Sequence, residues 1–211
     1  MLYGPFIALG YLCGSFTFGY WLVRWARGVD IRTVGSHNLG ATNVLRTFGW
    51  RWGVPVMLLD ILKAFGPTLA ATLVVGHLCG VLTGAATMVG HARPVFLKFA
   101  KGGKMVATAG GAFLGVAPLL GLVGVGVWIV AFLVTRYASV SSILASASLA
   151  PLAYGLGYPW PVVAFGGAAG LGVAVLHRAN VRRLLAGQES RFQFRRGGRK
   201  AGPGAEVPAS R

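Results

Sequence analysis

The sequence predicts an all-α integral membrane protein of about seven transmembrane helices, with its N-terminus outside the cell and its C-terminus in the cytoplasm. Three observations predict this class. The 211-residue chain has a mean hydropathy of +0.67 and contains six long apolar stretches. Of its 20 Lys and Arg residues, all but Lys63 lie outside those stretches, in a few segments between them or after the last one. The stretches also lack the period-two alternation of barrel strands.

The apolar stretches predict the helices in chain order. They cover residues 5–23, 53–75, 77–92, 106–135, 138–156 and 160–176. About 20 helical residues are needed to cross a hydrocarbon core of about 30 Å. The stretch 106–135 is too long for one untilted helix, and it contains Pro118, a residue type that breaks helices. We therefore expect a hairpin of two short or tilted helices there, which brings the number of helices to seven.

The positive charges predict the orientation. Lys and Arg follow the first, third and last stretches, whereas the turns near Gly76, Pro118 and Gly157 contain none. A hairpin at 106–135 places every basic segment on one side, which the positive-inside rule identifies as cytoplasmic. The formal net charge of +16 is thereby explained by topology, and we expect no nucleic-acid partner.

The chain is expected to form a membrane domain over residues 1–189 and a basic, disordered cytoplasmic tail over residues 190–211, because the tail is rich in Arg, Gly and Pro. Cys13 and Cys79 lie in apolar surroundings and are expected to be free thiols. Asp60 and Lys63 are spaced i, i+3 within an apolar stretch, and a mutual ion pair is favoured over a catalytic role there.

Three polar segments interrupt the apolar pattern, all on the predicted cytoplasmic side. The first island is GSHNLGATNVLR (35–46), the second is KFAKGGKMVAT (98–108), and the third is HRANVRRLLAGQE (177–189). In the first island, glycines allow backbone N–H groups to face one ligand, and Arg46 offers a fork suited to phosphate. A loop with ordinary helix caps explains this island equally well.

The second and third islands extend the same chemistry. Lys101, Gly102, Gly103 and Lys104 lead directly into an apolar helix, whose N-terminus attracts anions. Alone this is a weak signal, since loops beside membranes are often rich in Gly and Lys. In the third island, His177 and Asn180 are spaced to share a helix face; His177 is either an interfacial residue or a general base.

Taken together, the three islands resemble, in order and spacing, the three motifs of the bacterial membrane acyl-phosphate:glycerol-3-phosphate acyltransferase family. DILKAFGP, GHARPVFLKF and TRYASVSSI also match, so the resemblance covers about residues 8–189. It implies a seven-helix enzyme of the bacterial plasma membrane that faces the cytoplasm. Such an enzyme transfers a fatty acyl group from acyl phosphate to the 1-hydroxyl of glycerol 3-phosphate, and it uses no cofactor or metal.

The resemblance also implies a set of site residues. The catalytic residues implied are His177, Asn180, Lys104 and Arg46. The residues implied to bind substrate phosphate are Ser36, His37, Asn38, Gly40, Thr42, Asn43, Lys101, Gly102, Gly103, Thr108 and Ser142. The sequence departs from the family pattern at Met105, where the family usually has Gly, at His37, where the family often has Gly or another residue, and at Ala100, which is inserted. The expected partners are the two substrates and membrane lipid, and the oligomeric state stays open.

Two other functions fit parts of the pattern. A small transporter for a phosphorylated or anionic solute would also use cations and glycine-broken helices, but the sequence has no internal repeat, and its islands lie at one surface instead of the midplane. A non-catalytic protein that organises anionic lipid would explain the charge but not the neutral Ser, Asn and Thr cluster. For the acyltransferase, either His177 or a substrate phosphate is left to accept the hydroxyl proton.

Overall fold

The computed structural model describes residues 2–192, and within these residues the chain is helical, without a strand. In chain order the helices are α1 (Tyr3–Ser15), α2 (Phe18–Arg27), η1 (Ile31–Thr33), α3 (Ala41–Phe48), α4 (Trp50–Val74), α5 (His77–Ala92), η2 (Val95–Leu97), α6 (Val106–Val116), α7 (Pro118–Thr135), α8 (Ala138–Gly155), α9 (Trp160–Leu176) and α10 (Arg178–Leu185). The predicted tail lies outside the described residues from residue 193 onwards.

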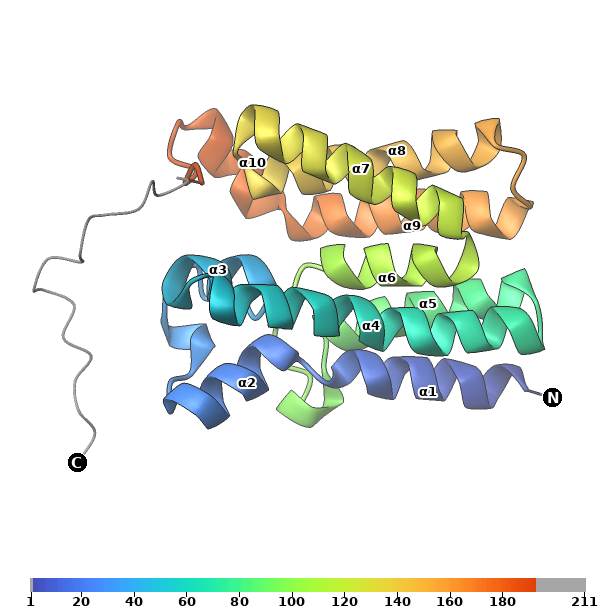
Figure 1. Ribbon diagram of the computed structural model, residues 1–211, viewed down its shortest axis with the longest axis horizontal. Coiled ribbons are helices and arrows are strands. Elements are labelled where there is room, and N and C mark those ends of the chain that lie inside the picture. Colours follow the sequence, from blue (N-terminus) through green and yellow to red (C-terminus); the bar gives the residue numbers. More distant parts are fainter. Residues whose placement is uncertain (1, 193–211) are drawn as a thin grey trace, which may run out of the picture.

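The long helices pack side by side in a bundle (Figure 1). Helix α1 packs on α5, α4 packs on α5 and α6, and α8 packs on α7 and α9. The two groups meet where α5 and α6 contact α9. Buried side chains fill this junction, and the rings of Phe113 and Phe165 stack there with their centroids 4.6 Å apart. The core therefore joins the N-terminal and C-terminal groups of helices.

Small residues allow the helices to approach closely. A Cβ atom on Gly111 of α6 would lie 2.1 Å from the carbonyl oxygen of Ile61 on α4. A Cβ atom on Gly14 of α1 would lie equally close to the carbonyl oxygen of Thr87 on α5. Helices in a bilayer gain little from the hydrophobic effect between one another, so close backbone contact of this kind provides much of their packing energy.

The expected break near Pro118 is confirmed. Helix α6 ends at Val116, and α7 begins at Pro118, whose missing N–H costs nothing at the first helical position. With 11 residues, α6 spans only about 16 Å, roughly half of a hydrocarbon core. The stretch 106–135 is thus a hairpin with one short arm.

The stretch 5–23 differs from the prediction of one continuous helix. The chain is extended at Phe16 and Thr17, so α1 and α2 are separate helices. The break exposes the carbonyl oxygen of Phe16, which accepts a hydrogen bond from Nζ of Lys63 at 2.9 Å. The predicted ion pair of Lys63 is confirmed, since its Nζ lies 2.7 Å from Oδ1 of Asp60. Both cysteines are free, as expected.

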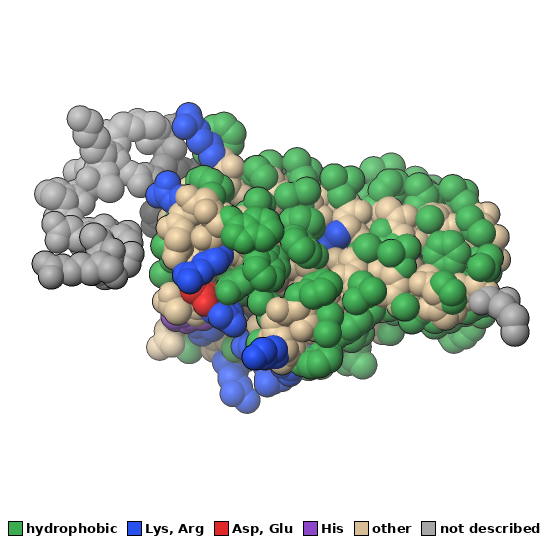
Figure 2. Space-filling model, turned by 90° about the horizontal axis from the view of Figure 1, so that it is seen from below, with side chains coloured by type: hydrophobic (Ala, Val, Ile, Leu, Met, Phe, Trp, Pro, Cys, Tyr) green, Lys and Arg blue, Asp and Glu red, His purple; other side chains and the backbone are tan. Residues whose placement is uncertain are grey.

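Length and hydropathy identify four candidate membrane spans: Tyr3–Arg27, Trp50–Val74, Pro118–Thr135 and Ala138–Gly155. Helices α9 and α10 add a fifth if this bent pair counts as one span. The chain starts at one end of the bundle, whereas α2, α3 and α10 lie at the other (Figure 1). Figure 2 shows Lys and Arg side chains gathered at that second end, beside a flank covered by hydrophobic side chains. The count of seven crossings and the orientation stay predictions.

Labelling of introduced cysteines tests the orientation. Leu156 directly follows α8 and Leu185 ends α10, both are exposed, and these two helix ends lie at opposite ends of the bundle (Figure 1). Each can be changed to Cys in a chain whose Cys13 and Cys79 are Ala. Because the basic end is expected to be cytoplasmic, a membrane-impermeant maleimide added to whole cells should label Leu156→Cys only. Leu185→Cys should react only after the membrane is opened. Labelling of both from outside would show that residues 106–135 cross the membrane once.

Candidate functional site

Residues from all three islands meet around one polar pocket of about 100 Å³ at the basic end of the bundle. The pocket is lined by Ser36, His37, Asn38, Lys101, Lys104, Leu176, Ala179, Asn180 and Arg183. Three of these nine side chains are Lys or Arg, and none is a carboxylate. The pocket therefore has the electrostatic character of an anion site.

The first island forms a tight loop around Asn43 at the start of α3. Asn43 is buried, and its Oδ1 accepts the backbone N–H of Ser36 at 2.8 Å. Its Nδ2 donates to the carbonyl oxygens of Val34 and Asn38, at 3.1 and 3.0 Å. Gly35 must lack a side chain, because its φ is +60° and a Cβ atom would lie 2.3 Å from the Asn43 amide oxygen. Asn43 thus holds the loop in place through its hydrogen bonds, and Ser36 lines the pocket.

The rest of the first island presents polar groups at the rim of the pocket. Oδ1 of Asn38 accepts the N–H of Gly40 at 2.9 Å, which fixes the Asn38 side chain. His37 has a φ of +58°, and its Nδ1 lies 2.9 Å from the carbonyl oxygen of Arg32. Since a carbonyl only accepts, Nδ1 carries the proton in this contact, and Nε2 is left for other partners. Thr42 is exposed on the first turn of α3.

The glycines of the second island attach the loop to the end of α5. The N–H groups of Gly102 and Gly103 donate to the carbonyl oxygens of Ala92 and His91, at 2.9 and 3.0 Å. Lys104 follows and donates from Nζ to Oδ1 of Asn180 at 2.5 Å. Partial burial lowers the pKa of Lys104 to about 8, although the charge of Glu189 opposes the shift. Lys104 therefore keeps a positive charge at neutral pH.

His177 stands at a bend of 58° between α9 and α10. The expected helix through His177 and Asn180 is therefore interrupted: His177 is at the junction and Asn180 is within α10. Nδ1 of the buried His177 ring lies 2.8 Å from the carbonyl oxygen of Val173. Nδ1 is thus the protonated nitrogen, and Nε2 keeps a lone pair in the neutral ring. Burial and the charge of Lys104 lower the pKa of His177 to about 4.

Glu189 is the central residue that the sequence prediction left out of the site. Its Oε1 accepts hydrogen bonds from Nδ2 of Asn180 at 2.7 Å and from Oγ of Ser139 at 2.9 Å. Its Oε2 accepts from Nε of Arg183 at 2.8 Å. Burial raises the pKa of Glu189, but these hydrogen bonds outweigh it and hold the pKa below its usual value. The available signal was its rarity, since the chain has only four acidic residues.

The residues that line the pocket do not include Thr108, Ser142, Arg46 or His177, although all four were expected in the site. Thr108 and Ser142 are buried, and their hydroxyls donate to the carbonyl oxygens of Met105, just before α6, and of Ala138 in α8. Nη2 of Arg46 donates to the carbonyl oxygen of Ser190 at 2.8 Å. Met105 has a φ of +66°, a conformation that favours glycine, so the glycine expected from the family pattern has a steric reason.

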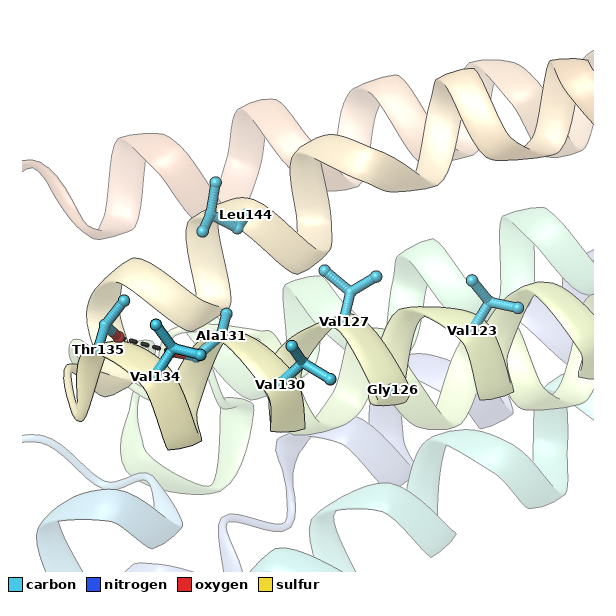
Figure 3. A pocket seen from close by; sticks show the side chains of 8 residues that line it. All are labelled: Val123, Gly126, Val127, Val130, Ala131, Val134, Thr135 and Leu144. Carbon is cyan, nitrogen blue, oxygen red and sulfur yellow. Dashed lines mark hydrogen bonds between the residues drawn. The ribbon is translucent and has the colours of Figure 1, made fainter.

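A second, apolar hollow of about 600 Å³ lies along α7 and α8. Figure 3 shows the eight residues that line it, four of which are valines of α7, with Leu144 from α8. None of the residues predicted for the site lines this hollow. Its surface has the hydrocarbon character expected of a face that contacts lipid.

Comparisons with known proteins agree with the family resemblance seen in the sequence. Residues 5–187 match the family described as "Glycerol-3-phosphate acyltransferase". The chain is 44% identical over 191 residues to the glycerol-3-phosphate acyltransferase of Desulforudis audaxviator, covering 90% of this chain and 96% of that protein. It is also 44% identical over 188 residues to the protein of the same name from Aquifex aeolicus, covering 88% of this chain and 97% of that protein.

Two solved structures are similar over nearly the whole chain. One is PlsY (YgiH), an integral membrane glycerol 3-phosphate acyltransferase, in its glycerol 3-phosphate form, with a TM-score of 0.87 and 42% identity. The other is the lysophosphatidic acid form, with a TM-score of 0.85 and 40% identity. Each alignment covers 92% of this chain and 96% of the other.

Removal of the Glu189 carboxylate should destabilise the protein. Glu189→Ala leaves the buried Asn180 amide and Ser139 hydroxyl without their acceptor, and hydrogen bonds to charged groups contribute about 1.5–3 kcal/mol each. We expect a loss of about 3 kcal/mol or more, measured as a lower Tm in detergent. Asp30→Ala is the matched control, because Asp30 pairs with Arg32 at the surface, where ion pairs contribute about 0–1 kcal/mol. Equal Tm values for the two variants would contradict this structural role.

Proposed function

The chain belongs to the glycerol-3-phosphate acyltransferase family, and on that premise we propose that it transfers a fatty acyl group from acyl phosphate to the 1-hydroxyl of glycerol 3-phosphate. The products are lysophosphatidic acid and inorganic phosphate. One observation carries this proposal: a pocket with three cations and no carboxylate is assembled from all three islands. Both proposed substrates carry a phosphate that such a pocket can bind.

In this proposal the cations bind the phosphates, and the neutral side chains bind the glycerol part. Lys104 has three N–H donors, and the described residues take one of them through Asn180. The remaining donors, with Lys101 and Arg183 on the pocket wall, bind phosphate oxygens in this proposal. The side chains of Ser36 and Asn38, which also line the pocket, add neutral hydrogen bonds that orient the glycerol part. Arg46 supplies a further fork, close to but outside the pocket wall.

The chemistry needs positioning more than activation. The 1-hydroxyl oxygen attacks the acyl carbonyl carbon, and the bond from that carbon to the phosphate oxygen then breaks. Lys104 and backbone N–H groups would stabilise the negative charge on the carbonyl oxygen and on the departing phosphate. Acyl phosphate is already an activated donor, so the alignment of the two substrates supplies much of the rate.

The hydroxyl proton passes to a substrate phosphate in this proposal. The pKa of His177 is about 4, whereas the second pKa of a phosphate monoester is near 6. His177 is therefore the weaker base of the two. With its Nδ1–H held by Val173, Nε2 of His177 can accept a hydrogen bond from the glycerol part and hold it in place.

The site is proposed to face the cytoplasm from a bacterial plasma membrane. The support is the concentration of Lys and Arg at the end of the bundle that carries the pocket. This position also argues against the transporter alternative, because secondary transporters bind their substrates near the bilayer midplane. A protein that only organises anionic lipid would not need the neutral donors of the first island.

Purified protein in detergent tests the proposal directly. Given acyl phosphate and glycerol 3-phosphate, it should release lysophosphatidic acid and phosphate at equal rates. Since no group of three or more His, Cys, Asp or Glu in residues 2–192 could hold a metal, activity should survive a strong chelator. Glycerol in place of glycerol 3-phosphate is the control for the phosphate requirement. Turnover that disappears with the chelator and returns with magnesium would reject the metal-free reaction.

A His177→Gln variant separates positioning from base catalysis. Glutamine keeps one hydrogen bond but cannot take up a proton. If His177 positions glycerol 3-phosphate, kcat should stay within about tenfold of the unchanged enzyme. A fall in kcat of about 10²–10⁴, the range for removal of a general base, would instead assign the proton transfer to His177. The Tm of the variant shows whether the buried ring has been replaced without loss of the fold.

A further inference from the structure

A buried polar cluster lies next to the pocket but outside it. It consists of Asp60 and Lys63 on α4 and His91 on α5, each at most 9% exposed. Nζ of Lys63 lies 2.7 Å from Oδ1 of Asp60 and 2.9 Å from Nδ1 of His91. The same nitrogen donates to the carbonyl oxygen of Phe16 at 2.9 Å. One ammonium group therefore connects α4, α5 and the break between α1 and α2.

The hydrogen bonds of Lys63 determine which nitrogen of the His91 ring carries the proton. An ammonium group has three donors and no acceptor, and Lys63 has three acceptors within reach. The nitrogen of His91 that faces Lys63 must therefore be the unprotonated one. In the neutral ring the proton is then on Nε2, so Lys63 holds both the tautomer and the orientation of the imidazole.

The His91 ring in turn contacts the glycines of the second island. A Cβ atom on Gly103 would lie 1.9 Å from Nε2 of His91, so the ring is packed directly against this glycine. The carbonyl oxygen of His91 also accepts the Gly103 N–H at 3.0 Å. Lys104 is the next residue along the chain. The ring and backbone of His91 together thus determine the path of the loop immediately before Lys104.

We propose that Asp60, Lys63 and His91 form a positioning unit that fixes the glycine loop and so places Lys104 for phosphate. The inference rests on the proposed function. A buried ion pair is often no more stabilising than apolar residues of the same volume, so stability alone is a weak reason for these three polar groups. What they supply is a fixed direction for the His91 ring, and apolar side chains would not supply it.

Hydrogen exchange combined with kinetics tests the unit. His91→Leu removes the acceptor for Lys63, whereas His91→Asn keeps an oxygen near the position of Nδ1. His77→Leu is the matched control, because it makes the same change at the opposite end of the same helix. In His91→Leu we expect the amides of residues 101–104 to exchange about tenfold faster, with kcat/KM for glycerol 3-phosphate about tenfold lower. His91→Asn and His77→Leu should stay within about threefold in both measurements.

Two results would overturn the inference. One is a folded His91→Leu protein with unchanged exchange and kinetics. The other is faster exchange spread evenly over α5 and α6, which is the result of general destabilisation. If His91→Leu does not fold, His91→Gln takes its place as the variant that disturbs the contact with Lys63, because the amide of the longer Gln side chain reaches past the position of Nδ1. Hydrogen exchange can be measured without turnover. If the protein without substitutions has no acyltransferase activity, the proposed function is rejected, but the exchange measurement still decides this inference.

Discussion

The candidate site depends on one chain of hydrogen bonds, from Lys104 through Asn180 to Glu189. Lys104 donates to the amide oxygen of Asn180, and the amide nitrogen of Asn180 donates to the carboxylate of Glu189. The amide separates the two charges. A direct pair between Lys104 and Glu189 would occupy the ammonium group with its own counter-ion. With Asn180 between them, the carboxylate still stabilises the partly buried cation, and the cation keeps donors for a ligand.

The same chain connects parts of the fold that are far apart in the sequence. Lys104 precedes α6, Asn180 lies in α10, and Glu189 also accepts from Ser139 at the start of α8. The bend at His177 is needed for this arrangement, because it turns α10 away from the line of α9 and across the end of the bundle. A largely apolar bundle thus carries one polar end, which suits a reaction between a lipid-borne acyl group and a water-soluble phosphate.

Local chemistry made some features predictable from the sequence. Pro118 explains the hairpin, and the i, i+3 spacing explains the pair of Asp60 and Lys63. The convergence of the three islands was expected because they carry the positive charges of one membrane side. Other features depend on contacts between distant residues. The break at Phe16 contains neither Gly nor Pro, and the partner of its carbonyl oxygen is Lys63, 47 residues away.

The roles of single site residues were the least predictable part. Asn43 and Ser36 are both neutral residues that can form hydrogen bonds, so the sequence does not separate their roles. In the fold Asn43 is buried and supports the loop, whereas Ser36 lines the pocket. Glu189 is the last residue of the third island in the sequence, yet a turn after α10 brings its carboxylate within hydrogen-bond distance of the Asn180 amide. Neither outcome follows from residue type or spacing, because both depend on which backbone groups come within reach after folding.

A double-mutant cycle on Lys104 and Asn180 tests the central claim most directly. The measurement is kcat/KM for glycerol 3-phosphate in Lys104→Met, Asn180→Leu and the double variant, with Tm values to confirm folding. If the two side chains act as one unit, the double variant should be little worse than the poorer single variant, with a coupling of about 1.5–3 kcal/mol. Effects that add within about 0.5 kcal/mol would show that the two residues act independently and would contradict the account.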